Sequence, residues 1–294
     1  MMIKKFIQKI IGKINRYRLF INPRIYRPSS EPFISGDSFR KISDHVFDET
    51  QTVNPSKVLK NDLVFVKNDL LKYYFHNYHS KIKNPYILIS HNSDENIDNS
   101  YIKLIDDNII HWFSQNLKIK NSDRISSLPI GLENMRYRKN GIVKQFSETK
   151  NVIEKKFGIM SSFNENTNFN EREYLRKIID NHNDIDHSNF NSTRDYLEAL
   201  NKSKFNICPS GNGLDTHRIW ESLIFKTVPI VTRNLMIENF FDMGIPMIVL
   251  DEWEELKSLS LNEIGKLNEA NNEKSFFKYT NFDHWINLIY SKKI

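Results

Sequence analysis

The chain has 294 residues, 39% of them hydrophobic and 12% aromatic, so it is long enough for two domains that each bury a core. Its formal net charge of +6 is local, because eight basic residues precede the first acidic residue, Glu31, and the rest of the chain therefore sums to about −2 (+6 minus +8). A near-neutral body argues against a nucleic-acid-binding module, and the single cysteine, Cys208, excludes an internal disulfide and a cysteine-based zinc site.

Residues 1–28 are predicted to form a basic amphipathic helix. Apolar residues recur at helical spacing between the lysines, at Ile3, Phe6, Ile7, Ile10, Ile11 and Ile14. No run approaches the roughly 18 apolar residues that span a bilayer, and no signal-peptide cleavage pattern follows. Two roles stay open: residues 3–27 bind an anionic membrane surface, or the apolar stripe packs on the protein's own domain.

A first Rossmann-like domain is predicted over residues 29–145. Short apolar stretches at 58–66, 86–90 and 109–113 are typical of its strands. The second stretch ends in polar residues, at the strand end where open α/β sheets bind ligands. His91 and Asp94, with Glu95 behind them, are therefore candidates for a general base that takes a proton from an acceptor hydroxyl. The alternative is a polar turn that caps the next helix.

The chain is predicted to leave the first domain through residues 126–137. Pro129 and Gly131 interrupt this extended stretch, and Glu133 and Asn134 add polar groups beside the expected cleft. Either of these two side chains could contact a ligand. A plain linker explains the same residues equally well.

A second Rossmann-like domain is predicted over residues 146–294. Residues 152–160 form its first strand, and the loop 161–170 and helix 171–180 follow. Ser162 and Arg172 would donate hydrogen bonds to phosphate there, in place of a glycine-rich fingerprint. Further helices are expected at 193–203, 251–261 and 276–290, and the last of them would pack back on the first domain.

Residues 204–234 carry the most informative pattern, which predicts a βαβ unit. An apolar strand, 205–208, ends at Pro209, and the following glycines favour a tight turn with positive φ. A helix then begins after Asp215 or Thr216, and a buried strand follows at 228–231. Small residues before a helix let backbone N–H groups approach an anion, and the helix N-terminus favours negative charge.

The polar residues of this unit suit a nucleotide. Arg218 and Glu221 are three residues apart, so they share a helix face. Arginine can donate two hydrogen bonds to a diphosphate, and a carboxylate can accept hydrogen bonds from both ribose hydroxyls. The alternative is an ordinary surface ion pair between the two. The predicted donor-binding residues are Ser162, Arg172, Ser210, Gly211, Asn212, Gly213, Asp215, His217, Arg218 and Glu221.

About 30 residues here resemble the exostosin-like glycosyltransferases of family 47 and, more loosely, other enzymes with the two-domain GT-B fold. The matching positions are Phe205, Pro209, Gly211, Gly213, Arg218, Glu221, Leu223, Pro229 and Ile230. The sequence departs from the pattern where Ser222 replaces an alanine and Lys226 and Thr227 replace a glycine turn. The resemblance implies a GT-B fold, two Rossmann-like domains facing a central cleft, with Arg218 on the donor diphosphate and Glu221 on its ribose.

The function that follows is transfer of a sugar from a nucleotide donor, a UDP-sugar, to a glycan or lipid-linked acceptor, with inversion. Such a transferase would serve bacterial surface polysaccharide synthesis from the cytoplasm, peripherally at the inner membrane face. We expect no cofactor and no metal, since Asp106 and Asp107 would point to opposite faces of a strand and the nine histidines are scattered. The alternative is a non-catalytic, membrane-associated assembly protein on a degenerate transferase fold.

Overall fold

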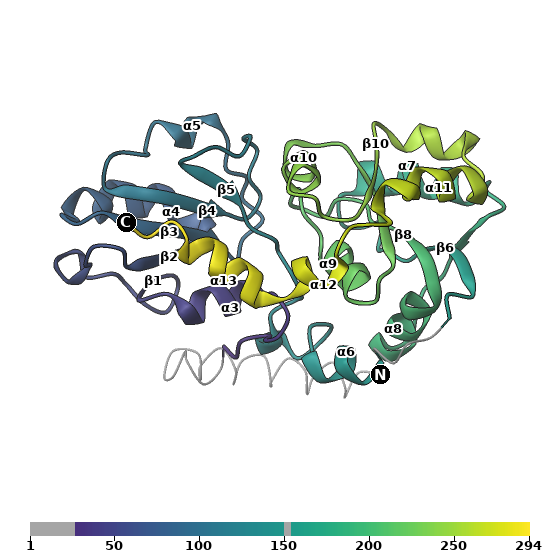
Figure 1. Ribbon diagram of the computed structural model, residues 1–294, viewed down its shortest axis with the longest axis horizontal. Helices are drawn as coiled ribbons and strands as arrows, with labels where there is room; N and C mark the ends of the chain where they lie inside the picture. Colours follow the sequence, from purple (N-terminus) through teal and green to yellow (C-terminus); the bar gives the residue numbers. More distant parts are fainter. Residues whose placement is uncertain (1–26, 150–153) are drawn as a thin grey trace.

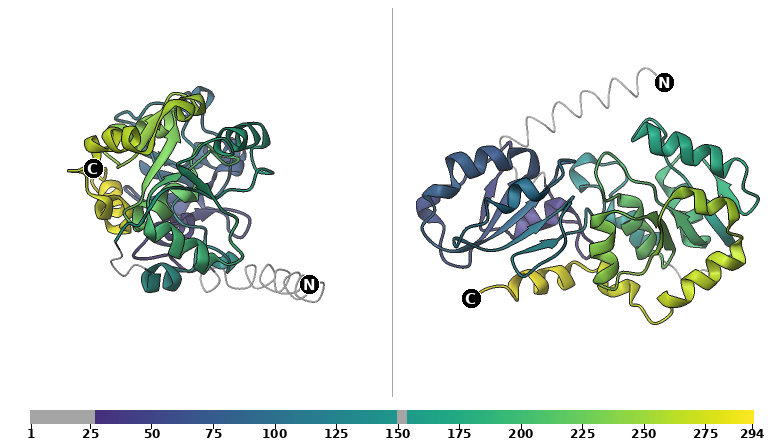
Figure 2. Two further views of the ribbon diagram at one scale, coloured as in Figure 1. Left: turned by 90° about the vertical axis from the view of Figure 1, so that its right-hand side faces the viewer. Right: turned by 90° about the horizontal axis from the view of Figure 1, so that it is seen from above.

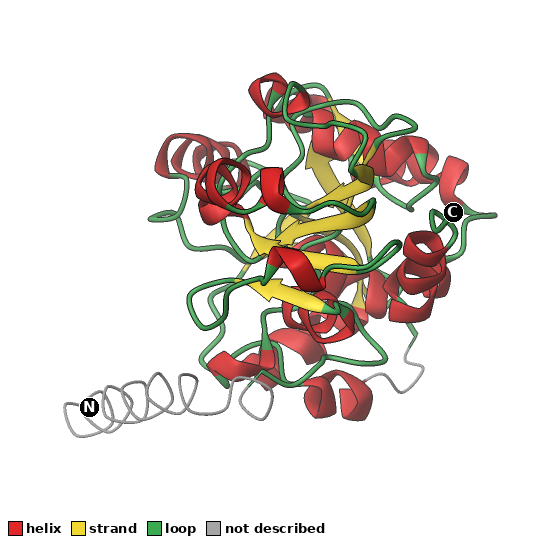
Figure 3. Cartoon of the chain, turned by 90° about the vertical axis from the view of Figure 1, so that its left-hand side faces the viewer, coloured by secondary structure: helices red, strands yellow, loops and turns green. Residues whose placement is uncertain are grey.

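The structure is a computed structural model that describes residues 27–149 and 154–294 (Figure 1). It contains two parallel β-sheets of five strands, one from each half of the chain. Helices lie around the strands, as Figures 2 and 3 show. Two Rossmann-like domains side by side define the GT-B type of α/β fold, so the predicted fold class is confirmed. Apart from its last two residues, the predicted amphipathic helix of residues 1–28 lies outside the described residues.

The strands of the first sheet follow chain order, β1-β2-β3-β4-β5. They are β1 (His45–Phe47), β2 (Leu63–Lys67), β3 (Tyr86–His91), β4 (Ile109–Ser114) and β5 (Ile125–Ser127). β3 is buried along its whole length, as expected for a parallel strand covered by helices on both faces. The predicted strand 58–66 is wrong in its first half, because Asn61 has a φ of 69°, which a strand does not accommodate.

Short helices connect these strands and lead out of the domain. They are α3 (Gly36–Ile42), η1 (Pro55–Lys57), η2 (Asn68–Leu70), α4 (Leu71–Asn77), η3 (His79–Lys81), α5 (Asn99–Ile102), η4 (Met135–Tyr137) and α6 (Val143–Thr149). The last of them already packs on the second domain, where Phe146 stacks on Phe225 with ring centroids 5.9 Å apart. The chain between β5 and α6 therefore runs from one domain to the other.

The strand order of the second sheet, β10-β9-β8-β6-β7, reverses between β6 and β8. Its strands are β6 (Phe157–Ser161), β7 (Ile185–His187), β8 (Ser203–Ile207), β9 (Val228–Thr232) and β10 (Ile248–Leu250). Its helices are α7 (Phe169–Ile179), α8 (Thr193–Lys202), α9 (His217–Ile224), α10 (Leu235–Asp242), η5 (Trp253–Ser258), α11 (Leu261–Leu267) and η6 (Asn268–Asn271). A reversal of strand order opens a crevice at the carboxyl ends of the two strands, where such sheets bind ligands.

The segment predicted as one helix, 276–290, is two: α12 (Phe276–Thr280) and α13 (Phe282–Tyr290). Asn281 separates them in an extended conformation, and its side chain accepts a hydrogen bond from the backbone N–H of Asp283. Figure 1 shows α13 lying along the first domain. There Phe282 meets Phe39 edge to face, with ring centroids 5.2 Å apart.

One of the apolar clusters extends across both domains. Trp220 on α9 meets Phe240 on α10 and Trp285 on α13 edge to face, at centroid distances of 5.2 and 6.2 Å. These rings belong to the same buried cluster as the strands of the first sheet. Buried amides add polar contacts, since Asn239 donates to the carbonyl oxygen of Ile119 at 2.8 Å and to the Ser127 hydroxyl at 2.9 Å. Apolar and polar contacts therefore join the two domains.

Candidate functional site

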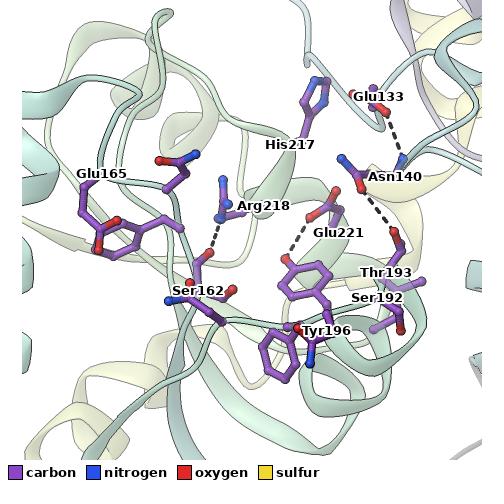
Figure 4. Close-up of a pocket in the computed structure, with 16 residues that line it drawn as sticks. Glu133, Asn140, Ser162, Glu165, Ser192, Thr193, Tyr196, His217, Arg218 and Glu221 are labelled. Carbon is purple, nitrogen blue, oxygen red and sulfur yellow. Dashed lines mark hydrogen bonds between the residues drawn. The ribbon is translucent and has the colours of Figure 1, made fainter. Parts of the chain in front are cut away.

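A cavity of about 580 Å³ lies at the carboxyl edge of the second sheet, beside the reversal of strand order (Figure 4). Loops after β6 and β7, helices α8 and α9, and the segment leaving the first domain all contribute to it. Its lining comprises Glu133, Asn140, Ser162, Phe163, Asn164, Glu165, Asn189, Phe190, Asn191, Ser192, Thr193, Tyr196, Leu197, His217, Arg218 and Glu221. This volume is in the range of small-molecule sites.

Arg218 projects from the first turn of α9 into this cavity (Figure 4). Its Nε donates to the carbonyl oxygen of Ser162 at 2.5 Å, which fixes the plane of the guanidinium. The two terminal nitrogens make no hydrogen bond or ion pair with any residue of the described ranges. A planar fork with free donors is the group that binds phosphate oxygens in pairs.

Glu221 lies one turn further along α9 and faces the same cavity. It is buried, and its Oε2 accepts a hydrogen bond from the Tyr196 hydroxyl at 2.8 Å. Burial and the Glu221 carboxylate raise the pKa of Tyr196 well above its usual value, so this hydroxyl stays a donor. Among the described residues no ion pair joins Arg218 to Glu221, which removes the surface-pair interpretation.

His217 is the first residue of α9, and one of its ring nitrogens makes a hydrogen bond. Its Nδ1 lies 2.7 Å from the carbonyl oxygen of Gly131, in the segment that leaves the first domain. Because a carbonyl can only accept, Nδ1 carries the proton. Its Nε2 has no hydrogen-bond partner in the described part of the chain.

The predicted glycine loop, Ser210 to Gly213, does not line this cavity. Neither Gly211 nor Gly213 has a positive φ, so the predicted tight turn is wrong. A Cβ on Gly213 would lie 2.5 Å from the Asn116 side chain, whereas one on Gly211 would meet only Arg172, at 3.8 Å. Gly213 is thus needed for close contact with the first domain. Asn212 is exposed and donates to Asp94 across the interface, at 3.3 Å.

Arg172 also lies outside the cavity lining, contrary to its predicted role. Its guanidinium is buried and donates to the carbonyl oxygens of Ser210, Asn164 and Pro209, at 2.9, 2.9 and 3.4 Å. Burial and the nearby Arg218 lower its pKa to about 10, so it remains charged at neutral pH. Its donors are used to tie the loop after β6 to the loop after β8.

Asp215 is turned inward instead of toward a ligand. It is 2% exposed and accepts hydrogen bonds from the backbone N–H groups of Ile130 and Thr216, both at 2.7 Å, and from the indole of Trp220. Burial raises the pKa of this carboxyl to about 7. Asp215 therefore joins the exit segment of the first domain to α9, and it does not reach the cavity.

A smaller cavity of about 240 Å³ lies on the first-domain side. Its lining comprises Gly36, His91, Asn92, Ser93, Asp94, Gln115, Ile130, Leu132, Glu133, Asn134, Arg136, Tyr137 and His217. Of the described residues, Glu133 and His217 are the two that line both cavities. The two spaces therefore meet at these side chains.

The structure places His91 and Asp94 beside this smaller cavity, but His91 is buried and Asp94 is exposed. His91 is 1% exposed, donates from Nε2 to the carbonyl oxygen of Pro129 at 2.9 Å and accepts at Nδ1 from the backbone N–H of Asn92 at 2.8 Å. Burial lowers its pKa to about 4. With both nitrogens engaged, His91 cannot act as the predicted base. Asp94 is exposed and remains available.

Sequence reasoning missed several residues that line the larger cavity. Tyr196 is one of them, and its hydroxyl orients Glu221. Asn140 joins the two sides, since its backbone N–H donates to Glu133 at 2.9 Å and its side chain accepts from Thr193 at 3.2 Å. The polar residues Asn189, Asn191, Ser192 and Thr193, which lie just before and at the start of the predicted helix 193–203, were the signal that could have identified the loop.

No group of three or more histidine, cysteine, aspartate or glutamate side chains within residues 27–149 and 154–294 could hold a metal ion. Metal independence stays a prediction. In the same ranges no helix is long and apolar enough to cross a bilayer.

A family model described as the RXYLT1 C-terminal domain matches residues 169–290. This is less than half of the chain, but it contains all helices from α7 to α13, with Arg218 and Glu221. No curated protein matches the chain.

Solved structures with a related arrangement include OtsA in its apo form (10% identity, covering 81% of this chain and 74% of that one, TM-score 0.47). Another is an E. coli structure described as trehalose-6-phosphate bound with UDP-2-fluoro glucose (12% identity, 81% and 74% covered, TM-score 0.47). A third is the pneumococcal O-GlcNAc transferase GtfA in complex with UDP and GlcNAc (11% identity, 81% and 58% covered, TM-score 0.40). The assignment of the fold to the GT-B type rests on the two sheets and their strand order.

Proposed function

We propose that this protein is a glycosyltransferase that transfers a sugar from a nucleotide-sugar donor, a UDP-sugar, to a glycan or lipid-linked acceptor. The observation that carries the proposal is the pair Arg218 and Glu221. They face one cavity from successive turns of α9, without pairing with each other, at the reversal of strand order. The family-model match over residues 169–290 includes this whole helix.

The donor diphosphate binds at the terminal nitrogens of Arg218 and the amino end of α9, where charge-assisted hydrogen bonds and the helix dipole both favour an anion. Three carboxylates also line the cavity, but each already has a partner. Glu133 accepts from the backbone N–H of Asn140, and Glu221 accepts from the Tyr196 hydroxyl. Oε1 of Glu165 lies 3.8 Å from Nη1 of Arg176, which makes an ion pair. Electrostatic stabilisation of the leaving diphosphate requires no metal on this proposal.

The ribose hydroxyls donate to Glu221, whose Oε1 has no partner in the described ranges. The acceptor occupies the smaller cavity, which its carboxylate, amide and hydroxyl groups suit for a sugar. The sugar then passes between the two cavities by direct displacement with inversion, as the exostosin-like resemblance implies.

The exostosin-like assignment, a role in bacterial surface polysaccharide synthesis and a peripheral position at the cytoplasmic membrane face belong to the same proposal. The basic residues of 3–27 support membrane contact, because each Lys or Arg near an anionic surface contributes about 1 kcal/mol. Sedimentation with phosphatidylglycerol vesicles but not with phosphatidylcholine vesicles is the expected result. Equal recovery with both would contradict it.

Calorimetric titration with UDP, GDP and CMP tests the proposal. We expect UDP to bind, and Arg218→Ala to weaken binding at least about tenfold, since a charge-assisted hydrogen bond contributes roughly 1.5–3 kcal/mol. Lys177→Ala removes an exposed charge paired with Glu173 on α7 and serves as the matched control with unchanged affinity. If none of the nucleotides binds, or if Arg218→Ala binds as tightly as the wild type, the proposal fails.

A further inference from the structure

We infer that His217 is the general base that takes the proton from the acceptor hydroxyl, an inference that rests on the proposed transferase function. Its position carries the inference. His217 is one of the two side chains that line both cavities, so it lies where a donor in one would meet an acceptor in the other.

The protonation pattern of the ring suits this role. The Gly131 carbonyl oxygen, 2.7 Å from Nδ1, can only accept a hydrogen bond, so it holds the single proton of the neutral ring on Nδ1. Nε2 then carries a lone pair and no proton. An unprotonated Nε2 can accept a hydrogen bond from the acceptor hydroxyl, but it cannot donate one to a phosphate oxygen. This nitrogen therefore suits a general base and not a diphosphate-binding group.

The acceptor oxygen forms a bond to the anomeric carbon while its proton moves to Nε2 of His217. The bond between that carbon and the phosphate oxygen breaks, and its electron pair leaves with the nucleoside diphosphate at Arg218. The imidazolium that forms keeps its Nδ1–H bond to Gly131, which favours the charged ring.

Other charged and titratable groups face His217 from both domains. The segments of the first domain contribute Asp94, Glu133, Arg136, Tyr137 and the buried His91, and α9 contributes Arg218 and Glu221. Glu133 is the rival, because it shares both cavities. One oxygen of Glu133 already accepts a hydrogen bond from the backbone N–H of Asn140, whereas Nε2 of His217 has no hydrogen-bond partner in the described part of the chain, so the lone pair of the ring is the one that is open to an acceptor hydroxyl.

Three variants separate the roles. His217→Asn keeps an amide N–H at the position of Nδ1, and so the bond to Gly131, but removes Nε2. His217→Gln places its amide at the position of Nε2 and loses the bond to Gly131. Glu133→Gln removes the rival carboxylate. We measure UDP release from UDP-glucose and UDP-N-acetylglucosamine, with water and with methyl glycosides as acceptors, together with UDP affinity.

We expect His217→Asn to lower turnover by about 10² to 10⁴ with an unchanged UDP affinity. Glu133→Gln should lower turnover far less. The inference is overturned if Glu133→Gln has the large effect, or if His217→Asn retains wild-type turnover. A wild type that binds no nucleotide refutes the proposed function itself, which is a separate failure.

Nitrogen NMR of ¹⁵N-histidine-labelled protein tests the tautomer without any substrate. His217→Asn identifies the signals that belong to this ring. We expect a protonated Nδ1 and a bare Nε2 in the neutral form at high pH. The reverse tautomer would contradict the assignment of Nε2 as the base even if the variants lose activity.

Discussion

Arg218 and Glu221 illustrate how one helical turn divides the work of binding a nucleotide. Each is oriented by a different neighbour, Arg218 by the Ser162 carbonyl and Glu221 by the Tyr196 hydroxyl. Because these neighbours occupy one nitrogen and one oxygen only, the remaining polar atoms stay free for a ligand. Oppositely charged side chains that share a helix face attract each other, and an ion pair between Arg218 and Glu221 would have used these polar atoms.

The assignment of Glu221 to the ribose predicts how the protein discriminates against a missing hydroxyl. Wild-type protein should bind UDP about tenfold more tightly than 2′-deoxy-UDP, because hydrogen bonds to a charged group contribute roughly 1.5–3 kcal/mol. Glu221→Ala should bind both equally. Glu173→Ala, which removes a half-exposed carboxylate on α7, is the control that keeps the preference. A preference that survives in Glu221→Ala would remove this residue from the ribose.

The roles of the other candidate residues depended on distant segments. Arg218 and Glu221 are three residues apart, so predicting the helix is enough to place them on one face. His91 and Arg172 carry similar chemistry, yet their polar atoms are taken by the Pro129 and Ser210 carbonyls, 38 residues away in each case. No local pattern reveals such contacts, so buried bracing residues and ligand-binding residues look alike in the sequence.

At the scale of elements, local patterns predicted β8, α9 and β9 to within two residues. Apolar periodicity and capping residues act over a few positions, which is why they identify these elements. The strands β1, β5, β7 and β10 have three residues each, too few for a pattern. The glycines of the loop after β8 were read as a turn signal, but the loop is shaped by the first domain, where Asn116 accepts from the backbone N–H of Leu214 at 3.1 Å.

The two glycines of this loop should therefore respond differently to the same substitution. Gly213→Ala places a methyl group 2.5 Å from the buried Asn116 amide, and overpacking of this kind costs about 1–3 kcal/mol. A methyl group at Gly211 would make an ordinary van der Waals contact with Arg172, at 3.8 Å, and the backbone has no positive φ, so the stability of Gly211→Ala should match the wild type. Urea unfolding measures both. Equal stability of the two variants would show that the loop does not depend on contact with Asn116.

At the scale of the whole molecule, buried polar groups tie the domains together and make stability depend on pH. His91 is held neutral inside the protein, with a pKa lowered to about 4 by burial, whereas an unfolded chain gives histidine a pKa near 6.5. Asp215 acts in the opposite direction, because burial raises its pKa to about 7. As the pH falls from 7 to 4, the native state takes up a proton at Asp215 before the unfolded chain does, which adds stability.

The contribution of His91 can be isolated by substitution. Above pH 6.5 the ring is neutral in both states and has no effect, but as the pH falls toward 4 the unfolded chain binds a proton that the native protein does not. The unfolding free energy should then drop by about 3 kcal/mol through this residue alone, since one pKa unit corresponds to about 1.4 kcal/mol. His91→Gln places an amide donor near the Pro129 carbonyl and cannot titrate.

Urea unfolding of both proteins at pH 7, 6, 5 and 4 measures this difference. The variant should lose about 3 kcal/mol less than the wild type between pH 7 and pH 4, whatever the other groups contribute, because those groups are common to both. The exposed His76 provides the control, and His76→Asn should follow the wild-type curve. Parallel curves for the wild type and His91→Gln would mean that the native protein binds a proton at His91 over the same pH range as the unfolded chain. Nδ1 could not then be held as an acceptor by the backbone N–H of Asn92, and the argument against His91 as a base would fail.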